Sequence, residues 1–324
     1  MVSLDFELFW GVRDKKTLDQ YRENLLAVRA VVPSLLELFR KHEIHATWAT
    51  VGFLFLKTRN ELMESLPAKR PTYEDQNLSP YADLHRIGVN ESEDPFHYAP
   101  SLIEMIAACP YQEIGSHTFS HYYCLESGQD ATSFREDLKA AIEAAKRYDL
   151  NIESLVFPRN QCNREYLAVC KEMGIKAYRG TESSWLYQAR NEGEDSLFKK
   201  GLRLIDAYVN ISGYHCYSQD KIACEFPFNI PSSRYLRPYL SRLRVLEPLR
   251  LRRVSSNLSY AARKGLIYHL WWHPHHFGGH IKESLSLLRK ILDHYLKLRK
   301  MYGMESLNMG ELTRRLIQQG AYDG

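Results

Sequence analysis

Apolar runs with strand character alternate along this chain with segments that have helical spacing. Runs rich in β-forming residues predict strands at residues 2–9, 44–54, 111–117, 153–160, 175–180 and 266–278. Recurring apolar positions on one face predict helices at residues 17–43, 101–108, 134–148, 163–174 and 284–303. Strands and helices in strict alternation are typical of parallel βαβ units. The pattern therefore predicts a single α/β domain, and we expect a barrel.

Two segments interrupt the alternation, and we expect them to be insertions into the domain. Residues 57–100 are polar and rich in turn-forming residues, and loops of this length are usually functional or disordered. Residues 231–265 are rich in arginine, and Glu247 is their only acidic residue. This second segment is either a solvated helical face or a surface for an anionic group, such as a diphosphate or the face of a membrane.

Composition and charge exclude several classes of function. The 324 residues are 44% hydrophobic and 25% charged, and the net charge of +4 is too small to indicate a nucleic-acid-binding protein. The six cysteines form no CxxC pair, so we expect reduced thiols. No apolar run reaches the roughly 18 residues of a membrane helix, and MVSLDFELFW lacks the pattern of a signal peptide. We therefore expect a cytoplasmic protein.

Acidic and histidine side chains form a candidate metal site. Asp5 and Glu7 are one residue apart on a predicted strand, so both carboxylates point the same way. His117 and His121 would share one face of a helix that begins after Ser116. A carboxylate with two such imidazoles makes a three-ligand site that keeps a position for water, which is the catalytic arrangement of zinc. The alternative for the two acids is that they lie at a strand end exposed to water. The alternative for the two histidines is that their spacing arose by chance.

Two further segments place polar residues near the ends of predicted strands. His273 ends a run of apolar strand-forming residues and precedes a proline, so its backbone is extended and it can be a general acid or a fourth ligand. Arg159 can orient a carboxylate through a bidentate contact, although a surface arginine would look the same. The other histidines of this region are expected at the rim: His275, His276 and His280.

Four short motifs in this order resemble those of the polysaccharide deacetylases, the NodB-homology or carbohydrate esterase 4 family. They are SLDFE (3–7), HTFSH (117–121), VFPRN (156–160) and LWWHPHH (270–276). The resemblance implies a distorted (β/α)7-type barrel. The family motif has two adjacent aspartates where this chain has D-x-E, a spacing similar to a divergent branch of the family.

The resemblance also implies an ion and its ligands. A divalent metal, with Zn²⁺ expected, would be held by Glu7, His117 and His121 and would activate a water molecule against an acetamide. Asp5 would be the catalytic base, although the motif leaves open which of the two acids is the base and which the ligand.

Other roles are implied in the same way. His273 would protonate the leaving amine, and Arg159 would keep Asp5 ionised and oriented. The fourth motif of the family has no secure counterpart, so the candidate substrate contacts are broader: Trp10, Trp185, Asp206 and His275.

The expected reaction is removal of the N-acetyl group from an amino sugar. A cytoplasmic enzyme would meet a nucleotide-linked or lipid-linked intermediate of surface-polysaccharide synthesis, with the Arg-rich segment at its diphosphate or at the membrane. One alternative is an allantoinase-like hydrolase of another C–N bond. Another is a non-catalytic carbohydrate-binding protein with the same fold.

Overall fold

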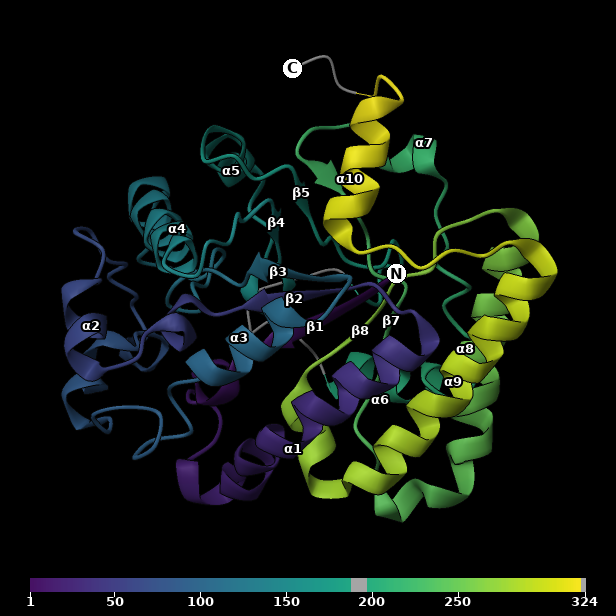
Figure 1. Ribbon diagram of the computed structural model, residues 1–324, viewed down its shortest axis with the longest axis horizontal. Coiled ribbons are helices and arrows are strands. Elements are labelled where there is room, and N and C mark those ends of the chain that lie inside the picture. Colours follow the sequence, from purple (N-terminus) through teal and green to yellow (C-terminus); the bar gives the residue numbers. More distant parts are fainter. Residues whose placement is uncertain (188–196, 322–324) are drawn as a thin grey trace.

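The computed structural model describes residues 1–187 and 197–321 and has a curled parallel sheet at its centre (Figure 1). The described strands pair in the order β6-β5-β4-β3-β2-β1-β8-β7, and every pair is parallel. Their bounds are β1 Val2–Phe6, β2 Ala46–Thr50, β3 Gln112–Ser116, β4 Ser154–Leu155, β5 Ala177–Tyr178, β6 Phe228–Asn229, β7 Arg234–Tyr235 and β8 Leu270–Trp272. Because β6 and β7 end the sheet, these strands form a distorted and unclosed barrel, as the sequence predicts.

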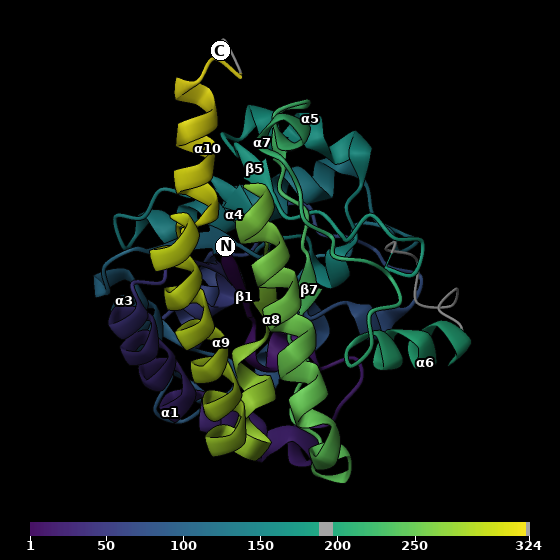
Figure 2. The same cartoon turned by 90° about the vertical axis from the view of Figure 1, so that its right-hand side faces the viewer.

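Helices follow most of the strands and surround the sheet (Figures 1 and 2). On one side, α1 packs between α3 and α9. None of the described helices is long and apolar enough to span a lipid bilayer. Their bounds are α1 Leu18–His42, α2 Arg59–Glu64, α3 Pro100–Ala108, α4 Ala131–Lys146, α5 Leu167–Glu172, α6 Leu197–Asp206, α7 Gln219–Ile222, α8 Glu247–Lys264, α9 Ile281–Tyr302 and α10 Met309–Gln318.

The central strand β1 separates a polar interior from an apolar helix layer. Leu4 and Phe6 point into the main hydrophobic core, where the ring of Phe6 meets that of Trp48 edge-on at 6.2 Å. Ser3 and Asp5 alternate with them and face the inside of the curled sheet. Because β1 lies between β2 and β8, its C-terminal end lies inside the sheet and not at a lateral edge.

Helix α1 forms as its sequence predicts. Thr17 and Gln20 make a reciprocal capping box at its start, and Glu43 in a left-handed conformation ends it. The buried residues recur on one face, so the helix covers the sheet with one apolar side. They are Leu25, Val28, Val31, Val32, Leu35, Leu36, Leu38, Phe39 and His42.

The two segments expected as insertions have structure of their own. Residues 57–100 contain α2 and two short 3-10 helices, and several of their side chains are buried, including Leu62, Tyr73 and Phe96. Residues 231–265 contain the edge strand β7, the 3-10 helix η8 (Ser241–Leu246) and α8. The Arg-rich segment therefore supplies one strand and one long helix of the fold.

Candidate metal centre

Asp5 and Glu7 lie at the C-terminal end of β1, and both carboxylates are buried. Each residue is only 3% exposed. Glu7 follows the strand directly and precedes the 3-10 helix η1 (Leu8–Gly11). Gly11 makes room for its carboxylate, because a Cβ atom at this position would lie 1.9 Å from Glu7 Cδ. Two carboxylates buried at one strand end are costly unless cations or hydrogen-bond donors compensate them.

Arg179, the residue that follows β5, compensates Asp5. Its Nη1 lies 2.6 Å from Oδ1 and its Nη2 lies 2.8 Å from Oδ2, a bidentate contact. The guanidinium also donates to Ser3 and Asn160 and lies 4.1 Å from the ring centre of Trp271. Burial disfavours the charged form of Asp5, but Arg179, His117 and His273 together outweigh it and hold the pKa of Asp5 below its usual value. Asp5 is therefore an ionised carboxylate in a fixed orientation.

The prediction that Arg159 orients Asp5 is wrong. Arg159 pairs instead with Asp14, and its guanidinium lies 4.2 Å from the ring centre of Tyr123. Its backbone is left-handed (φ 53°), and the side chain runs toward the loop after β3. Arg179 also directly follows an apolar strand, so the rule that selected Arg159 applied equally to it.

His117 and His121 reach Glu7 from a turn, and the predicted helix is wrong. His117 follows β3 directly, and residues 117–123 are not helical. Thr118 (φ 62°) and His121 (φ 59°) have left-handed backbones, which a helix does not allow. The turn nevertheless brings both imidazoles to the same side, so the two histidines converge for a different geometric reason than the spacing suggested.

Asp137 of α4 fixes the main chain between the two histidines. Its carboxylate accepts hydrogen bonds from the backbone N–H groups of Phe119 (2.7 Å) and Ser120 (3.2 Å), and from the Ser120 hydroxyl. Burial raises the pKa of Asp137 to about 6 despite these donors. Sequence reasoning missed this residue because nothing in the helical pattern distinguishes it from a solvated aspartate.

The imidazoles meet one oxygen of Glu7. The Nε2 atoms of His117 and His121 lie 3.2 and 3.1 Å from Glu7 Oε2. His117 donates its Nδ1–H to the carbonyl oxygen of Val156 (2.8 Å), so the lone pair of Nε2 faces Glu7. Burial lowers the pKa of His121 and keeps its imidazole neutral. Burial also opposes ionisation of Glu7, but His273 and the two imidazoles outweigh it and hold the pKa of Glu7 well below its usual value.

These three side chains fit a divalent ion such as zinc. All are buried, and their ligand atoms lie within 4.8 Å of one another. Zinc bonds of about 2.0–2.2 Å in a tetrahedron place neighbouring ligand atoms about 3.3–3.5 Å apart. The 3.1 and 3.2 Å separations between Glu7 Oε2 and the two Nε2 atoms are close to this value. One carboxylate and two imidazoles also leave a coordination position for water or substrate.

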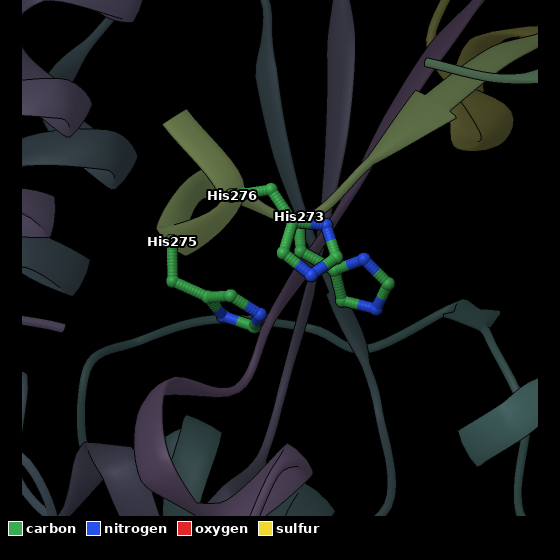
Figure 3. A group of neighbouring side chains, drawn as sticks. All are labelled: His273, His275 and His276. Atoms are coloured by element: carbon green, nitrogen blue, oxygen red, sulfur yellow. The ribbon is translucent and has the colours of Figure 1, made fainter. Parts of the chain in front are cut away.

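A second group of imidazoles follows β8 and consists of His273, His275 and His276 (Figure 3). His273 Nε2 lies 3.4 Å from Glu7 Oε1 and 3.7 Å from Asp5 Oδ2, so this imidazole contacts both carboxylates. His275 is buried, and its Nε2 is 3.9 Å from Glu7 Oε1. The expectation of a rim position is therefore wrong for His275.

The other two imidazoles form a neutral wall beside His273. Burial lowers the pKa of His275 to about 3 and that of His276 well below its usual value. His276 is also fixed by the hydroxyl of Tyr235, which lies 2.6 Å from its Nδ1. His273 packs against this wall, with its ring centre 4.5 Å from that of His276.

The two tryptophans named as candidate substrate contacts lie in different environments. Trp10 is buried, donates its indole N–H to the carbonyl oxygen of His97 (2.9 Å) and packs on Phe53. It is a core residue, so its predicted substrate contact is wrong. Trp185 is exposed in the loop after β5, with the Lys199 ammonium 5.6 Å from its ring centre. It stays a candidate.

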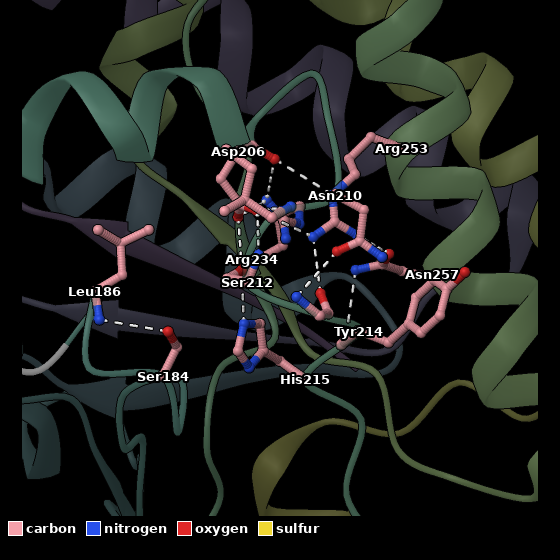
Figure 4. Close-up of polar contacts among 12 residues, drawn as sticks. Ser184, Leu186, Asp206, Asn210, Ser212, Tyr214, His215, Arg234, Arg253 and Asn257 are labelled. Atoms are coloured by element: carbon pink, nitrogen blue, oxygen red, sulfur yellow. Dashed lines mark hydrogen bonds and ion pairs between the residues drawn. The ribbon is translucent and has the colours of Figure 1, made fainter.

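Asp206 serves the fold and not a ligand (Figure 4). This buried carboxylate lies 3.0 Å from Arg234 and 3.4 Å from Arg253. It also accepts hydrogen bonds from the Ser212 backbone N–H (2.8 Å) and the Tyr187 hydroxyl (2.7 Å). Burial opposes its ionisation, but Arg234 and the hydrogen bonds outweigh it and lower the pKa of Asp206. Its acceptor sites are occupied by the protein, so the predicted substrate contact is wrong.

Comparison with known sequences identifies one family. The profile described as polysaccharide deacetylase matches residues 17–178, which is half of the 324-residue chain. The match includes His117 and His121, whereas Asp5, Glu7 and His273 lie outside it. A comparison with curated protein sequences gives no significant match.

Solved structures share the fold over nearly the whole chain. A protein from Mycobacterium smegmatis assigned as a polysaccharide deacetylase has a TM-score of 0.56 at 13% identity, covering 98% of this chain and 91% of that one. One from Pseudomonas aeruginosa PAO1 with the same assignment has a TM-score of 0.56 at 11% identity, covering 99% and 85%. Puue allantoinase has a TM-score of 0.55 at 12% identity, covering 99% and 84%. At sequence identities this low, the similarities show a shared fold only.

Replacing Gly11 by alanine tests whether the Glu7 carboxylate needs the space that this glycine leaves. The added Cβ would overlap the Glu7 side chain and push the carboxylate away from the two imidazoles. We expect the zinc affinity of the protein to fall about 10- to 100-fold, as when a group supporting a ligand is lost. Competition with a chromophoric chelator measures this affinity. Gly201→Ala, where a Cβ atom meets open space, is the control, and equal affinities in both variants would contradict the expectation.

Replacing Asp206 by asparagine tests its structural role. Arg234 and Arg253 would remain buried beside a neutral amide, so we expect the free energy of unfolding to fall by about 3–5 kcal/mol at neutral pH. Because the pKa of Asp206 is lowered in the folded protein, its contribution should be complete above the unfolded aspartate pKa of about 3.9 and be lost as the pH falls below it. Denaturant titrations of both proteins at several pH values measure the difference.

The matched control is Asp220→Asn, at an exposed aspartate. A stability loss in D206N no larger than in D220N would show that Asp206 is not needed by the fold. A difference between wild type and D206N that persists unchanged below the unfolded pKa would contradict the assigned origin of the stability.

Proposed function

The chain belongs to the polysaccharide deacetylase family, and we propose that it hydrolyses the N-acetyl group of an amino sugar. The observation that carries this proposal is the convergence of His117 and His121 on one oxygen of the buried Glu7, at 3.2 and 3.1 Å. In this proposal these three residues hold Zn²⁺, which when bound supplies a Lewis acid for the acetamide carbonyl.

The two carboxylates have separate roles in the proposed reaction. Glu7, whose partners are imidazoles, is the ligand. Asp5, whose partner is Arg179, is the base that takes a proton from the attacking water. This division is supported by the charge of the partners, because an arginine keeps a carboxylate ionised without competing for the same proton.

His273 is the proposed general acid. Its Nε2 lies 3.4 Å from Glu7 Oε1 and 3.7 Å from Asp5 Oδ2, so its ring faces the place where the acetamide would react. In the proposed reaction it gives its proton to the nitrogen that leaves the acyl carbon, and the products are acetate and a free amine. His275 and His276 hold the ring of His273 against the site.

The proposed substrate is a nucleotide-linked or lipid-linked N-acetyl sugar met in the cytoplasm. All six cysteines are free thiols, which agrees with a reducing compartment. Trp185, exposed in the loop after β5, offers an aromatic face for a sugar ring. Cell fractionation and an acetate-release screen over free, nucleotide-linked and lipid-linked sugars test these proposals.

Hydrolysis of a different C–N bond is the second candidate function. The similarity in fold to Puue allantoinase favours it, because the same arrangement of acids and imidazoles can attack a ureide carbonyl. Ureide hydrolysis without acetate release would select this candidate. Sugar binding with neither reaction would select a non-catalytic protein.

Replacing His117 by alanine removes one proposed ligand. We expect bound zinc to fall with an affinity loss of at least about 100-fold, since a missing ligand costs more than a missing supporting group, and acetate release to fall with it. Elemental analysis of purified protein and an acetate assay measure the two effects. His280→Ala, at the end of the neighbouring 3-10 helix η9 (Pro274–His280), is the control. Full metal content and full activity in H117A would contradict the proposed site.

Replacing Arg179 by methionine tests the base. Without the cation, the main group that opposes the effect of burial on Asp5 is lost, so its pKa should rise by about 1–3 units. We expect the acidic limb of the profile of kcat/KM against pH to move upward by this amount, because the base must be ionised. Arg159→Met should leave that limb in place. An unchanged limb in a folded R179M protein would exclude Asp5 as the titrating base.

A further inference from the structure

One face of α6 is apolar and exposed. Phe198, Leu202 and Ile205 are spaced four and three residues apart, so they lie on the same side of the helix. Phe198 is 71% exposed, and Ile205 is also exposed. Figure 2 shows α6 projecting from the body of the molecule. Large apolar side chains grouped on a surface mark an interaction site more often than scattered ones do.

The exposed apolar surface continues from the end of α6 to the start of α8. Val209 and Ile211 are exposed in the turn that follows α6. A hollow beside this turn is lined by Val209 and Tyr214 on one side and by Leu249 and Arg252 of α8 on the other. Just before α8, Val245 of η8 is 77% exposed. We call these side chains the apolar rim: Phe198, Ile205, Val209, Ile211, Val245 and Leu249.

Basic side chains are interspersed with the apolar rim. Helix α6 carries Lys199, Lys200 and Arg203, and its acidic residue Asp206 is buried between two arginines. Around Val245 and Leu249 the exposed basic residues are Arg242, Arg244 and Arg252. The only acid of residues 231–265, Glu247, pairs with the buried Arg250 at 2.5 Å. The surface is therefore both apolar and positively charged.

The apolar rim lies at the same edge of the sheet as the candidate metal centre. Helix α6 comes after β5 and η8 comes after β7, at the C-terminal ends of parallel strands. Tyr235 of β7 contacts the imidazoles of His273 and His276, and η8 begins six residues later. Parallel strands bring all their C-terminal ends to one edge, so α6 and η8 lie at the edge of the sheet where β1 ends at the candidate metal centre.

We propose that the apolar rim docks on the surface of an anionic phospholipid bilayer. Apolar side chains of an amphipathic surface enter the boundary between headgroups and acyl chains, and neighbouring lysines and arginines attract the lipid phosphates. A second copy of this chain fits less well, because pairing two such rims would bring like charges together. The evidence for docking is the composition of the apolar rim and its basic neighbours. The purpose of docking, which is to present a lipid-linked sugar to the site, rests on the proposed function.

Vesicle co-sedimentation of the full chain tests the docking without any substrate. Wild type should bind vesicles of phosphatidylglycerol and phosphatidylcholine and should be released by salt, while pure phosphatidylcholine should bind it weakly. Arg242→Gln with Arg244→Gln should weaken binding about 25-fold, about fivefold for each charge. Phe198→Ser with Val245→Ser should weaken it at least about tenfold, because inserted apolar area is lost.

Matched controls come from surfaces away from the rim. Met63→Ser with Met301→Ser removes two exposed apolar side chains from α2 and α9, and Met301 is 67% exposed. Lys297→Gln with Lys300→Gln removes two charges from the end of α9. Both control pairs should bind as wild type does. Thermal unfolding should be the same for all four variants, since every substituted side chain is on the surface.

Three outcomes would overturn the proposal. They are no binding by wild type, equal binding to neutral and anionic vesicles, and equal losses in the rim and control variants. A dimer in lipid-free solution that F198S/V245S dissociates would assign the rim to a second copy instead. Acetate release from a soluble N-acetyl sugar, measured without vesicles, reports separately on the proposed function and should be unchanged in the rim variants.

Discussion

The structure depends on the burial of two carboxylates at the end of its central strand. Asp5 and Glu7 are almost inaccessible to water, and an isolated carboxylate in such a place would take up a proton. The protein prevents this in two ways, with one arginine for Asp5 and several imidazoles for Glu7. Because these partners follow β5, β3 and β8, compensating the two charges requires these strands to be assembled with β1 in one sheet.

The site is positioned by groups that do no chemistry themselves. Asp137 fixes the turn that carries His117 and His121, and Gly11 leaves space for the Glu7 carboxylate. The left-handed residues of the turn have higher conformational energy than helical ones, so they persist only because hydrogen bonds hold them. This support explains how imidazoles on a loop can meet a carboxylate on a strand with separations close to those of a metal site.

A second buried ionic network joins α6, β7 and α8. Asp206, at the end of α6, holds Arg234 of β7 and Arg253 of α8 together (Figure 4). The same residues connect the elements that carry the apolar rim, and β7 also contacts the histidines after β8. The surface proposed to meet a membrane is therefore connected to the candidate site through β7.

The sequence by itself determined the alternation of strands and helices, because burying one face of each element imposes its own period on the chain. It also determined that two acids and two histidines belong together, since motifs at strand ends converge at one edge of a parallel sheet. The arginine of Asp5, the turn in place of a helix at His117, and the burial of Trp10, Asp206 and His275 were decided only by the tertiary structure. These features depend on side-chain contacts between segments that are distant in the sequence, and on left-handed backbone conformations that such contacts stabilise. A local sequence pattern contains no information about contacts of this kind.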